Sequence, residues 1–258
     1  MIKREELTDF IYERLGEDWM QKGLTKDEVA NGVQVVGSEE VEKVTLGVSA
    51  NEEFLTEAAK WGANYCIFHH GLDPRTYKSR YPLHSQKRLR LVFENNMTVA
   101  GFHYTLDAHP ELGNNAVIIR ELGAKIKEPL FEEWGYTAEF PKAKDVHDLA
   151  HEANKLFDHE VFAVLNGPHK VKTIGVVSGA AKPFAQIYGE FEDKGVELFI
   201  SGETSESVPH AMKENEINYF ACGHYATEVF GVKALGKEIE KEFGKRVEVK
   251  FIDIENPV

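Results

Sequence analysis

"VTLGVSANEEFLTEAAKWGANYCIF", residues 44–68, indicates the fold of this chain. Two apolar runs of strand length, at 44–49 and 64–68, flank a segment that carries the signals of a helix. Asn51 can cap that helix at its start, and Gly62 can end it. We therefore expect a β-α-β unit, which is typical of α/β proteins.

The second half of the chain repeats this order. Residues 172–203 line up with residues 44–71, because both contain a strand, a small-residue turn, a helix, a glycine and another strand. Residues 217–228 resemble residues 97–107 in the same way, since each is an apolar run followed by His-Tyr and an acid. We interpret this parallel as an internal duplication of an α/β half. The expected halves are residues 1–126 and 127–258.

Composition and charge limit the function of the 258 residues. The chain is 42% hydrophobic and 28% charged, as folded proteins are, and its net charge of -13 predicts no nucleic-acid partner. No stretch approaches the roughly 18 apolar residues of a membrane span, and the charged N-terminus does not resemble a signal peptide. Cys66 and Cys222 lie in apolar segments, so we expect reduced, buried thiols and a cytoplasmic location. The basic residues 78–90 read as a solvated helix face beside an anionic small substrate.

Polar side chains that could bind a metal ion or transfer a proton cluster where the predicted strands end. The clusters are His69 and His70; His103, Asp107 and His109; Glu203 and Glu206; and His224 and Glu228. Open α/β sheets bind their ligands at such strand ends. If the two halves pack around a pseudo-twofold axis, these clusters face one shared crevice.

Imidazoles and carboxylates without cysteine suit zinc, iron, manganese or nickel. His224 and Glu228 are four residues apart and share one face if a helix begins there. His69 and His70 would point to opposite sides of a regular strand, unless the strand breaks at Gly71. The candidate ligands are too many for one tetrahedral ion, and they suit two ions about 3.5–4 Å apart that share a carboxylate.

Each cluster also has a simpler interpretation. A single buried histidine is usually a hydrogen-bonded core residue, and a His-Glu pair on a helix is often a surface pair. The common position of the clusters at strand ends favours metal binding. His147 and His151 have helical spacing but no strand end beside them, so we expect a solvated helix face there.

Five motifs resemble, in order, those of the dinuclear-metal family named after the NGG-one-interacting factor three. The motifs are "NGVQVVG" (31–37), "FHHG" (68–71), "HYTLDAHPELGNN" (103–115), "FISGETSE" (199–206) and "GHYATEVFGVKAL" (223–235). Members of this family are widely labelled as GTP cyclohydrolase I type 2. The resemblance implies two similar, intertwined α/β halves, two divalent ions per chain, and a toroidal homohexamer with metal sites facing its interior.

The resemblance also implies a ligand set. His69 and His224 would hold one ion, His70 and Asp107 the other, and Glu228 would bridge the two. The residues beside this set, in contact with ligands or substrate, would be His103, Tyr104 and Glu203. The chain departs from the family pattern at Tyr225, where relatives often have histidine, and at "GVSAN" (47–51), where many have an aspartate a few residues on.

The function that these expectations favour is dinuclear metal-dependent hydrolysis of a small molecule. Two ions that share a solvent oxygen supply hydroxide near neutral pH, and His103 or Glu203 would move the proton. With a purine nucleotide such as GTP, attack at C8 would open the ring and release formate. The chain lacks a G-x-x-x-x-G-K-[ST] loop, and phosphoester or amide hydrolysis would use the same ions. The alternative is a non-catalytic hexameric scaffold or regulatory protein that binds metal.

Overall fold

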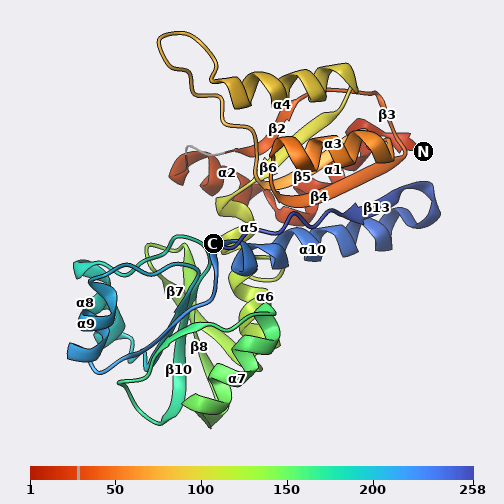
Figure 1. Cartoon of the computed structure of the whole chain (residues 1–258). Helices are drawn as coiled ribbons and strands as arrows, with labels where there is room; N and C mark the ends of the chain where they lie inside the picture. Colours follow the sequence, from red (N-terminus) through yellow and green to blue (C-terminus); the bar gives the residue numbers. More distant parts are fainter. Residues whose placement is uncertain (28–29) are drawn as a thin grey trace. The chain divides into compact units, whose positions relative to one another are not determined.

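The computed structural model describes residues 1–27 and 30–258, which form two compact units (Figure 1). The first unit contains Met1–Leu106 and Gly231–Glu255, and the second contains Asp107–Phe230 and Asn256–Val258. This division differs from the boundary at 126/127 that the sequence suggests. Packing and pairing explain the difference, because the helix Asn114–Glu121 packs into the core of the second sheet and the strand Glu248–Phe251 pairs in the first sheet.

The first unit is built on a mainly parallel five-stranded sheet. Its elements are β1 (Ile2–Lys3), α1 (Arg4–Leu15), α2 (Glu17–Lys26), β2 (Asn31–Val35), β3 (Glu40–Val41), β4 (Lys43–Ser49), α3 (Glu52–Trp61), β5 (Tyr65–His70), α4 (Leu83–Glu94), β6 (Thr98–Phe102), the 3-10 helix η1 (Gly244–Arg246) and β13 (Glu248–Phe251). The strand order is β13-β4-β5-β6-β2, and only β2 runs antiparallel to its neighbour. β1 and β3 form a separate antiparallel pair.

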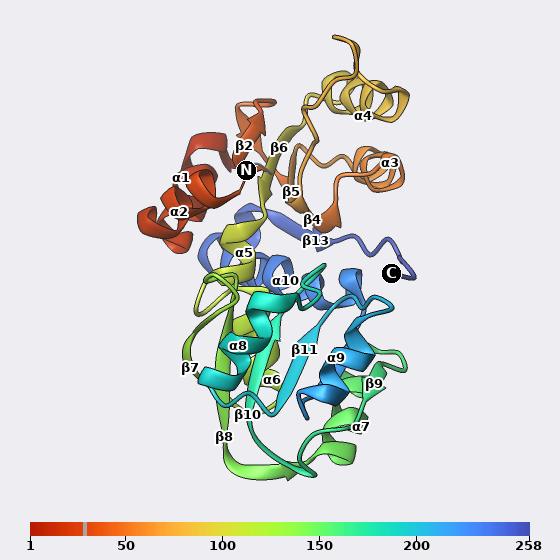
Figure 2. The same ribbon diagram turned by 90° about the vertical axis from the view of Figure 1, so that its left-hand side faces the viewer.

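The helix predicted between the first two strands is confirmed as α3. The side chain of Asn51 accepts a hydrogen bond from the Phe54 backbone N–H at 2.7 Å, and this bond caps the first turn. Gly62 ends the helix in the left-handed conformation at φ +82°. Phe54 packs in one core cluster with Cys66 and Phe68 of β5, so the helix holds β5 in place. Figure 2 shows α3 and α4 on one side of β5 and α1 on the other.

The second unit is built on a six-stranded sheet of order β7-β8-β10-β11-β12-β9. Its elements are α6 (Asn114–Glu121), β7 (Lys125–Leu130), β8 (Gly135–Asp145), α7 (Val146–Phe157), β9 (Phe162–Val164), β10 (Lys170–Val177), α8 (Ala185–Asp193), β11 (Leu198–Ser201), α9 (Val208–Glu214) and β12 (Asn218–Ala221). One apolar core lies under α6 and α7, and another lies under α8 and α9 (Figure 2). The sheet is therefore covered on both faces, as α/β sheets are.

The two sheets share a connectivity. In each, three parallel strands follow one another, β4-β5-β6 or β10-β11-β12. An antiparallel strand that precedes them in the chain, β2 or β9, pairs with the third. This common order is compatible with the predicted internal duplication.

The chain passes between the units at three points, of which two lie in helices and the third follows Glu255. α5 (Tyr104–Ala108) contains the first of these points, and α10 (His224–Phe243) contains the second. In the described part of the chain, no helix is both long enough and apolar enough to span a membrane.

Candidate metal centre

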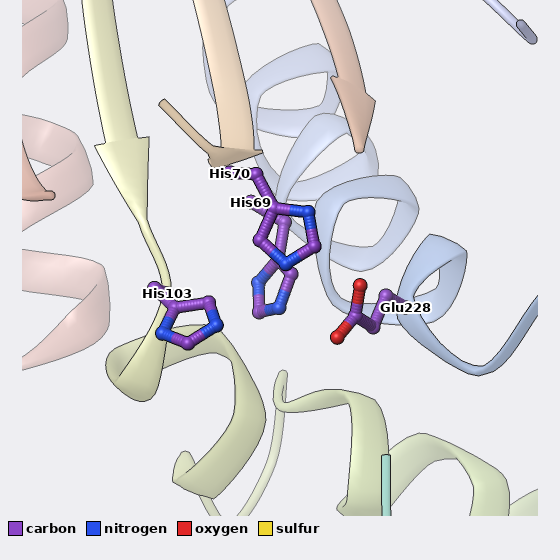
Figure 3. A group of neighbouring side chains, drawn as sticks. All are labelled: His69, His70, His103 and Glu228. Atoms are coloured by element: carbon purple, nitrogen blue, oxygen red, sulfur yellow. The ribbon is translucent and has the colours of Figure 1, made fainter. Parts of the chain in front are cut away.

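Three imidazoles gather at the carboxyl ends of β5 and β6 in the first unit (Figure 3). His69 and His70 are the last residues of β5, and His103 follows β6 directly. The ring centroids lie 4.7 Å apart for His69 and His70, and 4.8 and 5.2 Å from these rings to His103. One ring nitrogen of each histidine lies within 4.8 Å of the other two. We call these three residues the histidine cluster.

The geometry of His69 and His70 differs from that of a regular strand. Alternation predicts rings on opposite sides of the sheet, yet the two rings are neighbours because β5 ends at His70. The following residue, Gly71, allows the chain to leave the sheet there, since a Cβ at this position would overlap Gln34 Oε1. The break that the sequence suggested at Gly71 is thus confirmed.

Hydrogen bonds orient each ring of the histidine cluster. His69 Nδ1 lies 3.1 Å from the Phe102 carbonyl, which can only accept, so this nitrogen donates. His70 Nδ1 lies 3.2 Å from Ser49 Oγ, and His103 Nδ1 lies 2.8 Å from Asp27 Oδ2. In all three rings Nδ1 has a protein partner, which is the arrangement of histidines that bind metal through Nε2.

Asp27 is a residue of the site that the sequence did not reveal. Its side chain is only 5% exposed, and Oδ2 also accepts hydrogen bonds from the Tyr104 backbone N–H and from Asn31 Nδ2, both at 3.1 Å. Asp27 and His103 are 76 residues apart in the chain, and no motif marks the aspartate. Three donors on one oxygen hold this carboxylate in place.

A second cluster lies within the second unit, at the start of α10. His224 Nε2 is 3.1 Å from Glu228 Oε1, which confirms that the two side chains share a helix face. His224 Nδ1 contacts Glu203 Oε1 at 2.6 Å, and Glu203 forms an ion pair with Lys182. Glu203, which follows β11, therefore orients the His224 ring. Lys182 is a second residue that the sequence did not indicate.

Asp107 and Glu228 contact the same turn after β10. Asp107 Oδ1 accepts hydrogen bonds from Ser178 Oγ at 2.6 Å and from Asn114 Nδ2 at 2.9 Å. The next residue, Gly179, has φ +66°, and a Cβ there would overlap Glu228 Oε1. Asp107, His224 and Glu228 therefore form a carboxylate-imidazole group around one glycine turn, and we call these three residues the α10 cluster.

Two neighbouring carboxylates, Glu228 and Glu203, raise the pKa of His224 to about 9. Burial is the largest single influence and lowers this pKa, but hydrogen bonds and charges from Glu228 and Glu203 together outweigh it. The Lys182 and His224 side chains hold the pKa of Glu203 below its usual value. Without metal, His224 and Glu203 thus form an ion pair at neutral pH.

The remaining sequence candidates are His109, His147, His151, Glu206 and the two cysteines. His109 Nδ1 accepts backbone hydrogen bonds from Glu111 and Leu112 at 3.2 and 3.0 Å, so its contacts are those of a turn. His147 and His151 are exposed on α7, as predicted. Glu206 is exposed, and the cysteines are buried free thiols, as expected. Burial raises the pKa of Cys66 to about 12, which opposes metal binding by sulfur.

A family model described as Duf34/NIF3 (NGG1p interacting factor 3) matches residues 6–257. The chain belongs to this family. Curated relatives include proteins named "GTP cyclohydrolase 1 type 2 homolog" from Haemophilus influenzae and Escherichia coli K12. The first is 33% identical and covers 98% of both chains, and the second is 34% identical and covers 99% of this chain and 100% of its own.

Two solved structures have the same fold as this chain. The protein ybgI, described as of unknown function, superposes with a TM-score of 0.85 at 31% identity and full coverage of both chains. A protein from Thermus thermophilus superposes with a TM-score of 0.82 at 28% identity, also over both whole chains. The family resemblance and the α/β fold expected from the sequence are thus confirmed.

Proposed function

We propose that this Duf34/NIF3 protein is a divalent-metal-dependent hydrolase. The observation that carries the proposal is the histidine cluster, in which three imidazoles lie with centroids 4.7 to 5.2 Å apart at adjoining strand ends. Protonated imidazoles at such distances repel one another, whereas neutral imidazoles share a cation readily. The donors of the α10 cluster are of the matching type, carboxylate and imidazole.

The proposed centre takes ligands from both clusters and holds two ions. The proposed ligands are His69 and His224 for one ion, His70 and Asp107 for the other, and Glu228 as the bridge. Their chemistry fits a pair of divalent cations, since two carboxylates and three imidazoles offer five donors and partly neutralise the charge. Such ions lower the pKa of water and polarise a bound substrate.

The neighbouring side chains have distinct proposed tasks. His103, held by Asp27, carries a proton between water and the leaving group, because its pair with a carboxylate is the arrangement of a general base. Glu203 was the other candidate for this role. Its lowered pKa and its contacts with Lys182 and His224 favour a positioning role instead. The relatives named as GTP cyclohydrolase homologues support a nucleotide such as GTP as a first substrate to test, with ring opening at C8.

Metal analysis tests the centre directly. The protein is purified without added metal, and its content is measured by elemental analysis before and after exposure to zinc, iron, manganese or nickel. We expect about two ions per chain, as a two-ion site demands. Asp107→Ala and Glu228→Ala are expected to reduce this ratio, whereas His151→Ala, on the exposed face of α7, leaves it unchanged. A wild-type protein that stays metal-free under all four conditions contradicts the proposal.

Turnover separates the hydrolase from the alternative function. The metal-loaded protein is incubated with GTP and with generic phosphoesters, and formate and phosphate are measured. Turnover that is lost in Asp107→Ala and Glu228→Ala supports the enzyme. Tight metal binding with no turnover on any substrate supports a metal-binding scaffold or regulatory protein.

Assembly and location complete the proposal. We propose a homohexameric ring, which predicts a solution mass six times the 29.2 kDa of the chain by light scattering. A monomeric or dimeric mass contradicts the ring. Two buried free thiols fit a reducing compartment such as the cytoplasm.

A further inference from the structure

A cavity of about 450 Å³ lies beside the histidine cluster, within the first unit. His70 and Ser49 line one part of it, and Arg75 and Arg88 line another. Its size suits a small ligand. A molecule bound in this cavity touches His70 and an arginine together.

Arg88 carries the excess positive charge of this cavity, because the acids near it are paired with other basic side chains. Arg75 Nε and Nη2 donate to the two carboxylate oxygens of Asp73 at 2.7 to 3.0 Å, so these two residues neutralise each other. Besides Asp73, the acid that acts on Arg88 is Glu52. The Glu52 carboxylate forms an ion pair with Lys87 Nζ at 3.0 Å, so Lys87 balances its charge. Among residues 1–27 and 30–258, the buried Nε of Arg88 has no hydrogen-bond partner.

A half-buried guanidinium with an unused donor recognises oxyanions. Arginine stays protonated at any physiological pH, and its planar fork matches the oxygens of phosphate. Burial disfavours the charged form of Arg88 and lowers its pKa. A bound anion would stabilise the charged form. The charge and the geometry therefore both favour a bound anion.

A second cavity of about 360 Å³ adjoins the first and is mainly apolar. The two share Leu72, Asp73, Pro74 and Arg88 in their walls. The remaining wall of the second cavity includes Val35, Leu89, and the large side chains Tyr81 and Phe93, which are 43% and 65% exposed. From the first cavity to the second, a ligand would therefore meet His70, then Arg88, and then the apolar wall with Tyr81 and Phe93.

The chain segment between the cavities and the sheet is fixed by Gln34. Its side-chain amide donates to the Leu72 carbonyl and accepts from the Leu72 N–H, both at 2.7 Å. This pair of bonds anchors the backbone as it leaves β5. The walls shared by the two cavities are therefore pre-formed on one side, which favours selective binding.

We propose that the two cavities bind a phosphate monoester with a planar apolar group. Arg88 holds the phosphate beside His70, and the apolar group lies against Tyr81 and Phe93. This inference deepens the proposed hydrolase and rests on it for the chemistry. Water adds its oxygen to phosphorus, the bond from phosphorus to the ester oxygen breaks, and that oxygen takes the proton to leave as an alcohol. A nucleotide bound in this order presents its phosphate, rather than C8 of its base, to the histidine cluster.

Binding to metal-free protein tests the inference without any turnover. Inorganic phosphate and 1-naphthyl phosphate are titrated into chelator-treated protein, and their affinities are measured by calorimetry. We expect Arg88→Gln to weaken both ligands at least about tenfold, as the loss of a charge-assisted hydrogen bond does. Phe93→Ala is expected to weaken only 1-naphthyl phosphate. Arg90→Gln, at an exposed position of the same helix and outside both cavities, leaves both affinities unchanged.

Different results would contradict this inference and the proposed metal centre. If wild type binds neither ligand, or if Arg88→Gln binds both as well as wild type, the inference is wrong. Circular dichroism checks the fold of the variant, and Arg88→Lys serves as a second variant, with an expected affinity between those of wild type and Arg88→Gln. If the wild-type protein loads metal and turns over GTP but does not bind 1-naphthyl phosphate, the result counts against this inference alone. If the wild-type protein binds 1-naphthyl phosphate as expected but takes up no metal in the metal analysis, the result counts against the proposed centre alone.

Discussion

Asp27 accepts a hydrogen bond from His103 Nδ1 over 2.8 Å, and this contact joins the end of α2 to the end of β6. The same carboxylate oxygen also accepts from the Tyr104 N–H, so the aspartate holds both the ring and the backbone that follows it. A fixed Nδ1–H leaves Nε2 as the basic nitrogen of the ring. The pair therefore sets the tautomer of His103 before any ligand arrives.

Replacing Asp27 with asparagine tests this arrangement. Asp27→Asn keeps the size of the side chain but removes its charge, and we expect metal affinity to fall about 10- to 100-fold, as loss of such supporting bonds does elsewhere. Competition with a zinc-binding dye measures the affinity. Asp148→Asn, at an exposed position of α7, is the control. Equal affinities in the two variants would show that Asp27 does not support the site.

Glycine substitutions separate backbone strain from crowding at the α10 cluster. Gly179 and Gly195 have similar φ angles, +66° and +62°, but only a Cβ at Gly179 would overlap Glu228. Gly195→Ala should therefore lower the free energy of unfolding by about 1–2 kcal/mol through strain alone. Gly179→Ala should lower it further and also reduce metal content. Urea unfolding and elemental analysis measure the two effects, and a Gly179→Ala protein with full metal content contradicts the described packing.

The buried thiol of Cys66 should resist alkylation. Its pKa of about 12 keeps it protonated in the folded protein, while the unfolded chain ionises near the ordinary value of 9.0. Iodoacetamide at pH 8.5 should label Cys66 in urea but not in native buffer, as mass spectrometry would show. Ser205→Cys, at an exposed position, provides a thiol that labels in both states. Because only the unfolded thiol ionises, the stability of the protein should also decline above pH 9.

Stability of the metal-free protein should depend on pH through His224. Its folded pKa of about 9 exceeds the ordinary value of 6.5, so its ion pairs stabilise the fold fully below pH 6.5. That contribution is lost as the pH rises from 6.5 through 9. Urea unfolding of wild type and His224→Gln, both treated with chelator, should show a stability difference that shrinks over this window. A difference that is constant from pH 6 to 9.5 speaks against the ion pairs.

Local signals explain why much of the fold was predictable from the sequence. Asn51 and Gly62 define α3 through bonds within a few residues, and Gly16 ends α1 in the same manner. The edges of the sheets depend instead on partners far along the chain. β13 pairs with β4 across some two hundred residues, and no periodicity predicts such a pairing.

The candidate site shows the same contrast. Strand ends and the spacing of His224 and Glu228 are readable from neighbouring residues, and the structure confirms both. Asp27 and Lys182 were missed because their value lies in contacts with side chains 76 and 21 residues away. An isolated aspartate or lysine has no local signature, so only the folded chain reveals it.

The position of β13 has a consequence for how the protein is made. This strand comes from residues 248–251, so the β4 edge of the first sheet stays open until these residues have been synthesised. All six strands of the second sheet lie between residues 125 and 221 and can pair earlier. During translation the second sheet is expected to form first, while β4 waits for residues 248–251. A nascent chain that stops short of β13 would present a bare strand edge, the kind that recruits other chains into aggregates.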